Sequence, residues 1–200
     1  MRELIVNTFM TLDGVMQAPG GPEEDPSGGF SHGGWSVKYW DEAMGEKMGV
    51  VMGKPFALLL GRKTYEIFAS HWPHTTDDPA AEPLNAARKY VASRTLDKVE
   101  WENSVLLKSD VVEEVGKLKN ESGPEIQVHG SSDLLQTLIK HNLIDRYVIW
   151  TFPVVVGPGK RLFGDGTAPA GLRLVETATS STGVTIAMYE PAGDIDYGTF

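Results

Sequence analysis

The chain has 200 residues, a formal net charge of −9 and no cysteine. The acidic surplus argues against nucleic acid or an anionic membrane as the main partner, because both attract basic surfaces. The lack of cysteine excludes a disulfide framework, a thiolate nucleophile and any zinc site built from thiolates.

The sequence shows no signal for secretion or membrane insertion. Residues 1–14 hold too short an apolar run for a secretory signal, and no segment reaches the about 18 consecutive apolar residues that cross a bilayer. We therefore expect a cytoplasmic protein. Its length fits one domain that spans residues 1–200.

Eight runs of β-branched and apolar residues predict strands, and helical patterns lie between the earlier ones. The expected strands cover residues 4–9, 57–61, 89–93, 104–107, 125–130, 146–156, 172–179 and 183–191. The expected helices cover residues 37–53, 109–123 and 131–145, and another begins near residue 64. Helices between the early strands, followed by strands alone, indicate an α/β fold with a mostly parallel sheet and late antiparallel strands.

Two long segments lack such patterns. Residues 16–35 are dense in Gly, Pro and acidic residues, and residues 71–85 are rich in Pro. Long irregular segments of a compact domain are usually functional or disordered, and the first one directly follows a strand, where it is placed to cover a cleft. A metal site at His71 and His74 is disfavoured, because this pair lies in the Pro-rich segment without helical spacing.

The expected strand at 57–61 runs directly into Gly-Arg-Lys-Thr and a helix. A helix N-terminus presents free backbone N–H groups and a partial positive charge, which suit an anion. Gly61 lets the backbone approach a ligand, Arg62 and Lys63 add positive charge, and Thr64 is placed to cap the helix. An ordinary solvated turn is the alternative for this segment taken alone.

Two further strand ends carry similar residues. Gly-Ser-Ser at 130–132 stands between a strand and an amphipathic helix, and Ser-Arg-Thr at 93–95 ends another strand. Ligands of open α/β sheets bind beyond the carboxyl ends of the strands, so these three ends predict a ligand with more than one phosphate. The G-x-G-x-x-G fingerprint and the P-loop motif are both absent from the sequence, so another fold must hold this ligand.

Taken in order, the motifs of the chain resemble those of the dihydrofolate reductase-like superfamily, and within it the family with the reductase domain of bacterial riboflavin biosynthesis. They are TLDGVMQ (11–17), LLLGRKTYEIF (58–68), VASRTL (91–96), VHGSSDLLQTLI (128–139) and LIDRYVIWTFPVVVGPGKRLF (143–163). The resemblance covers nearly the whole chain. It implies a three-layer α/β fold, with helices on both faces of a mostly parallel sheet of about eight strands and an antiparallel C-terminal strand pair.

The resemblance also implies an NADPH-dependent reductase whose cofactor lies across the strand ends. It places Arg62 at the 2'-phosphate, where a bidentate contact would favour NADPH over NADH. The implied cofactor-binding residues are Gly61, Arg62, Lys63, Thr64, Ser93, Arg94, Thr95, Gly130, Ser131, Ser132, Leu134, Pro153 and Val154.

Fewer residues define the substrate end. Asp13 and Asp41 are the candidate catalytic residues, because they are the carboxylates expected to face the cleft. Trp35 and Trp40 are candidates for stacking on a flat heterocycle. Each has a structural alternative: Asp13 can shape the Leu-Asp-Gly turn, Asp41 can be a solvated residue near a helix start, and both tryptophans can belong to the core.

Riboflavin-biosynthesis relatives usually carry a zinc deaminase domain with cysteine ligands, which this sequence lacks. We therefore expect a stand-alone relative that reduces another small pterin-like or aminopyrimidine-like heterocycle. The alternative is a nucleotide-binding regulatory or scaffold protein that keeps the fold without turnover. Members of the family pair through sheet edges, and the long apolar C-terminal strands here make a homodimer an expectation.

Overall fold

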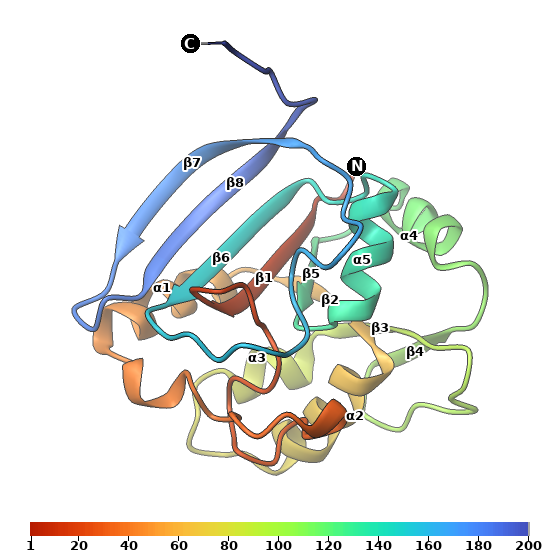
Figure 1. The fold of residues 1–200 in the computed structure, drawn as a ribbon. Coiled ribbons are helices and arrows are strands. Elements are labelled where there is room, and N and C mark those ends of the chain that lie inside the picture. Colours follow the sequence, from red (N-terminus) through yellow and green to blue (C-terminus); the bar gives the residue numbers. More distant parts are fainter. Residues whose placement is uncertain (200) are drawn as a thin grey trace.

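The computed structural model describes residues 1–199 and is built around one eight-stranded sheet with the strand order β4-β3-β2-β5-β1-β6-β8-β7 (Figure 1). The strands are β1 (Leu4–Thr11), β2 (Phe56–Gly61), β3 (Arg88–Ala92), β4 (Ser104–Leu107), β5 (Glu125–His129), β6 (Arg146–Phe152), β7 (Gly171–Thr179) and β8 (Thr185–Gly193). The helices are α1 (Glu42–Met52), α2 (Arg62–His71), α3 (Ala81–Ala86), α4 (Val111–Asn120) and α5 (Ser132–Lys140). The first six strands run in parallel, and β8 and β7 complete the sheet through antiparallel pairs.

Helices cover both faces of the sheet (Figure 1). On one face α4 and α5 pack their apolar stripes against alternate residues of the central strands, such as Val6 and Val128. On the other face α2 and α3 pack over β2 and β3, and Met44 of α1 packs near β6. A central parallel strand is therefore buried on both sides, which explains why β2 reads as a continuous apolar run. The expected three-layer α/β fold is confirmed.

Several expected elements differ from the structure: α4 and α5, for example, are shorter than residues 109–123 and 131–145. The segment 71–85, expected to be irregular, contains α3 and a short 3-10 turn. The first helix begins at Glu42 rather than at 37, because the Asp41 side chain caps it by accepting from the Met44 amide. Strand β6 ends at Phe152, because Pro153 has no N–H for the sheet ladder.

None of the helices within residues 1–199 combines the length and the apolar character that crossing a bilayer requires.

A buried leucine of α5 and an exposed leucine of β7 provide a test of this packing. Leu135 of α5 is fully buried, whereas Leu174 of β7 is 50% exposed. We expect Leu135→Ala to lower the free energy of unfolding by about 2–5 kcal/mol, because it removes buried methyl groups and leaves a cavity. Leu174→Ala should cost less than about 1 kcal/mol. Urea unfolding of both variants measures the difference, and equal losses would contradict the described packing.

Candidate functional site

A cavity of about 1480 Å³ opens beyond the carboxyl ends of β1, β2, β3 and β5. Because these strands are parallel, their ends and the helices that follow meet at one edge of the sheet. Sites for single drug-sized ligands occupy roughly 300–1,000 Å³, so this cavity has room for a dinucleotide together with a second small molecule.

Two helices direct free N-termini at the cavity. Within residues 1–199, neither Gly61 before α2 nor Ser131 before α5 makes a side-chain capping bond. By contrast, Asp41 caps α1 and Asp110 caps α4. Uncapped first-turn N–H groups carry partial positive charge, so both helix starts are suited to phosphate.

The two phosphate-suited turns are bonded to each other. The Gly61 amide donates to the Ser131 Oγ over 2.9 Å, and the Ser131 amide donates to the Thr64 Oγ1 over 3.0 Å. The sequence suggested that Thr64 caps α2. It does not, because the helix already begins at Arg62. Gly130 adopts a φ of 58°, and a Cβ there would lie 3.2 Å from the Thr64 Oγ1. Both features favour glycine at this position.

The expected cofactor residues largely come together. Those that line the cavity are Gly61, Arg62, Lys63, Thr64, Ser93, Arg94, Thr95, Gly130, Ser131, Ser132 and Leu134. Ser93 shapes its turn, because its Oγ accepts from the amides of Thr95 and Leu96. That these residues bind a cofactor stays a prediction, but their placement at one cavity is a finding.

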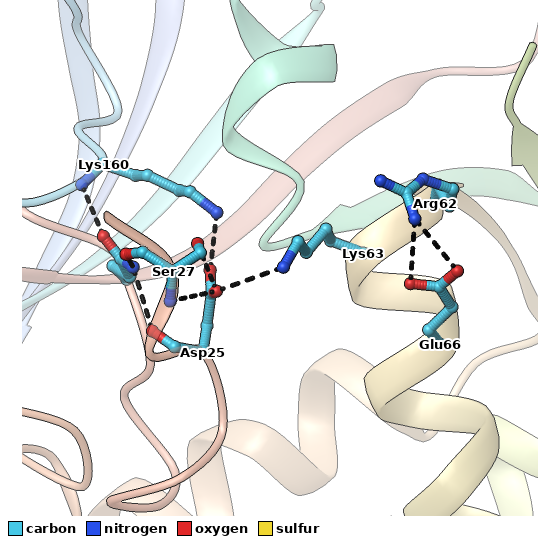
Figure 2. A network of polar contacts seen from close by, with 7 residues as sticks. Asp25, Ser27, Arg62, Lys63, Glu66 and Lys160 are labelled. Atoms are coloured by element: carbon cyan, nitrogen blue, oxygen red, sulfur yellow. Dashed lines mark hydrogen bonds and ion pairs between the residues drawn. The ribbon is translucent and has the colours of Figure 1, made fainter. Parts of the chain in front are cut away.

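The two cations of α2 have different partners (Figure 2). Arg62 pairs with Glu66 of its own helix at 3.3 Å, and both side chains are about half-exposed. Lys63 lies 3.6 Å from the buried carboxylate of Asp25, which also binds the Lys160 Nζ at 2.6 Å. The Arg62 guanidinium is thus held by an exposed surface pair, while Lys63 belongs to a network that reaches the 16–35 segment.

Asp25 anchors the 16–35 segment along the cavity. Burial works against its charged form, but hydrogen bonds from Lys160 and Ser27 outweigh burial and hold the pKa of Asp25 below its usual value. Gln17 reinforces the anchor by donating to the carbonyls of Asp25 and Ser27, each over 2.9 Å. The segment lines the cavity from Met16 to Asp25, as expected for a cover. The acidic, Gly-rich composition pointed to the segment, but nothing in the sequence singled out Asp25.

Both expected catalytic carboxylates lie outside the described cavity lining. Asp13 accepts from the Thr11 hydroxyl at 2.6 Å and from the Gly157 amide at 2.8 Å, so it ties the first turn to the segment after β6. Asp41 caps α1 and accepts from the amide and hydroxyl of Ser181. Hydrogen bonds, first from Thr11 and from Ser181 respectively, hold the pKa of each carboxyl below its usual value. Neither carboxylate is placed at the cavity lining, and the oxygens of each are engaged in local hydrogen bonds, so a catalytic role for them stays a prediction.

Three further expected residues also lie elsewhere. Trp35 is buried, donates to the Gln17 carbonyl over 2.8 Å and packs edge-on against Phe152. Pro153 and Val154 follow β6 and are not among the described cavity-lining residues; the Val154 carbonyl instead accepts from the Leu12 amide after β1. Trp40 does line the cavity. Its ring lies parallel to Trp150, 6.2 Å away, and is 45% exposed.

Two buried residues of the cavity were missed as site residues. Asn7 of β1 is 3% exposed and His129 of β5 is 9% exposed. Asn7 stands in a strand-like run without a local signal for a site, and His129, at the end of an expected strand, has the pattern of a structural residue with an internal hydrogen bond. The His129 Nε2 does lie 2.9 Å from the Gln127 Oε1. Burial lowers the pKa of His129 to about 4, so the ring is neutral at physiological pH.

Comparisons with known proteins give a family and a fold. The family described as RibD C-terminal domain matches residues 2–186. The uncharacterized protein YyaP of Bacillus subtilis (strain 168) is 28% identical over 196 residues, which cover 94% of each chain. These matches confirm the resemblance seen in the sequence.

Two solved structures share the fold. A putative riboflavin biosynthesis protein from Shewanella sp. PV-4 superposes with a TM-score of 0.67 at 21% identity, covering 94% of this chain and 98% of its own. The dihydrofolate reductase of Enterococcus faecalis, solved with NADP(H), superposes with a TM-score of 0.59 at 16% identity, covering 95% and 96%.

The buried, neutral His129 predicts a specific pH dependence of stability. In the unfolded chain it binds a proton near pH 6.5, but in the folded protein only near pH 4. As the pH falls from 6.5 to 4, the unfolded state therefore gains protons first, and this residue removes about 3 kcal/mol of unfolding free energy. Urea unfolding at pH 7, 5.5 and 4 measures the loss. His129→Gln, which does not titrate, should show a shallower decline; parallel declines would contradict the assignment.

Proposed function

The chain belongs to the RibD C-terminal domain family, and on this premise we propose that it is an NADPH-dependent reductase of a small pterin-like or aminopyrimidine-like heterocycle. The observation that carries the proposal is the pair of uncapped helix N-termini, α2 and α5, that face one cavity beside Arg62. Two such anion sites in an acidic protein suit the separate phosphates of a dinucleotide.

The donor set at the strand ends fits NADPH. The first-turn amides of α5, beside Ser132, suit the pyrophosphate, and Gly130 allows the backbone to approach it. Arg62 at the start of α2 suits the 2'-phosphate, because a guanidinium binds phosphate with two parallel hydrogen bonds. The NADP(H) in the dihydrofolate reductase of the same fold supports this choice of cofactor.

The remaining cavity suits the heterocycle. NADPH, when bound, supplies a hydride to the acceptor, so the chain's own task is to bind, orient and exclude water. Trp40 offers an exposed aromatic face, and Met48 and Met52 of α1 add flexible apolar surface. The anchored 16–35 segment limits access of water on the other side.

A second candidate function is a nucleotide-binding regulatory or scaffold protein without turnover. The placement of Asp13 and Asp41 in structural hydrogen bonds favours it, because the carboxylates first expected to assist protonation are not at the cavity. The two functions differ in one measurement. A reductase oxidises bound NADPH when pterins or aminopyrimidines are added, which the absorbance at 340 nm reports, whereas a scaffold binds NADPH without oxidising it.

The homodimer stays a prediction. Edge strand β7 exposes Leu172, Leu174 and Val175, which suits pairing with a second copy. Light scattering of the purified protein measures the oligomeric state.

Arg62 provides the test of the cofactor assignment. We expect Arg62→Ala to weaken NADPH binding by about 1–3 kcal/mol, the scale of a charge-assisted hydrogen bond, and to change NADH binding much less. Calorimetry with both nucleotides measures this. Arg88→Ala is the matched control, because Arg88 is exposed on β3 and outside the described cavity lining. Equal losses for the two nucleotides would contradict a 2'-phosphate contact, and no binding of either by the unaltered protein would overturn the proposed cofactor.

A further inference from the structure

The end of the cavity beside α1 is apolar and uncharged. Of the described residues between 36 and 52 that line the cavity, none carries a charge. Gly45 and Gly49 lie one turn apart on α1, and a Cβ on Gly49 would meet no described atom within 4 Å. The glycines therefore leave open space beside Trp40, whose ring stacks on Trp150. A flat ring fits such a space better than a bulky or charged group.

Hydrogen bonding fixes the proton position on His129, which also lines the cavity. The Gln127 Nε2 donates to the carbonyl of Val51 and to the Glu125 carboxylate, so its Oε1 must accept. That oxygen lies 2.9 Å from the His129 Nε2, which therefore carries the proton. The Nδ1 of the neutral ring is then a bare acceptor, and it has no hydrogen-bond partner among the described residues.

Hydrogen bonding also fixes the orientation of Asn7. The Trp150 Nε1, which can only donate, lies 2.8 Å from the Asn7 Oδ1. The Nδ2 of the same amide therefore faces the other way, and its contact in the described chain is the Met48 sulfur at 4.0 Å. A sulfur at this distance is a weak acceptor, so the buried amide keeps donor capacity for a ligand.

The free donor and the free acceptor are neighbours. Asn7 and His129 are direct partners in the parallel β1–β5 ladder, where strands lie about 4.8 Å apart, and both line the cavity. Neither atom has a strong hydrogen-bond partner in the described chain, so both can bond to a ligand in the cavity. A ligand that bonds to both groups must offer an acceptor and a donor at the spacing of the Asn7 and His129 side chains.

We propose that Asn7 and His129 form a subsite for the lactam edge of an uncharged, flat ring, in which the ring carbonyl accepts from the Asn7 Nδ2 and the adjacent ring N–H donates to the His129 Nδ1. This inference rests on the proposed function, which supplies the reaction, and it adds how the substrate ring is recognised. The adjacent carbonyl and N–H of a cyclic amide supply the required pair. An ionised ring is disfavoured, because a buried, neutral subsite offers no opposite charge to offset desolvation.

Two small molecules test the lactam edge. Quinazolin-4(3H)-one presents the carbonyl and the N–H on a flat neutral ring, and its 3-methyl derivative carries an N–CH3 group in place of the N–H. We expect the first to bind about ten-fold or more tightly than the second, since a lost hydrogen bond to a buried group costs a factor of this order. Ligand-observed NMR titration, with and without saturating NADPH, measures both dissociation constants. Equal affinities, or no binding of either compound, would overturn the subsite.

Two variants test where quinazolinone binds on the protein. Gly49→Leu fills the open space beside Trp40 and should abolish quinazolinone binding while NADPH binding is retained. Its folding is not at risk, because leucine is a better helix former than glycine. Gly116→Leu is the matched control: Gly116 lies in α4, outside the described cavity lining, and also has open space around a Cβ. Retained quinazolinone binding in Gly49→Leu would contradict the location.

A third variant tests the donor. Asn7→Asp keeps an oxygen for Trp150 but replaces the amide donor with an acceptor. We expect it to lose quinazolinone affinity by about ten-fold or more while the folded near-ultraviolet spectrum is kept; unchanged affinity would contradict the donor role. The outcomes separate the two proposals. If NADPH binds and the two quinazolinones bind equally, the proposed cofactor stands and the subsite does not. If the quinazolinones are discriminated and NADPH does not bind, the subsite stands and the proposed cofactor does not.

Discussion

The structure depends on where its parallel strands end. β1, β2, β3 and β5 end at one edge of the sheet, and the α2 and α5 helices that follow begin there without side-chain caps in the described chain. Uncapped first-turn amides carry partial positive charge and stay available to a ligand in the cavity. Asp41 and Asp110 cap α1 and α4, whereas α2, α3 and α5 begin without side-chain caps in the described chain. The starts of α2 and α5 are the ones that hydrogen bonds join at the cavity.

The carboxylates of the protein serve mainly as anchors around this edge. Asp25 fixes the 16–35 segment to Lys160 and Lys63, Asp13 fixes the turn after β1 to Gly157, and Asp41 fixes α1 to the β7–β8 hairpin through Ser181. Each is held ionised by its hydrogen bonds, which suits an anchor and not a proton donor.

Local sequence patterns were sufficient to predict the fold and the phosphate-suited strand ends of the candidate site. The strand ends at Gly61 and Gly130 could be recognised because glycine, hydroxyl and cationic residues follow an apolar run within the same segment. The roles of Asp41 and Asn7 could not, because they depend on Ser181 and Trp150, more than 130 residues away. An acidic residue before a helix has the same local pattern whether it caps or catalyses, so the long-range partner decides. The free nitrogen of His129 likewise depends on the orientation of Gln127 and on Val51.

The glycines that open the cavity also determine how firm its wall is. Gly45 and Gly49 each weaken α1 by about 1 kcal/mol relative to alanine, and within the described chain Met44 is the one buried residue of this helix. Polar contacts attach the helix at several points: Asp41 is bonded to Ser181, Lys47 pairs with Glu176, and the Val51 carbonyl accepts from Gln127. A helix with few buried side chains opens locally at lower free energy than one packed into the core. The wall of the cavity formed by α1 is accordingly more adaptable than the wall formed by the bonded turns between α2 and α5.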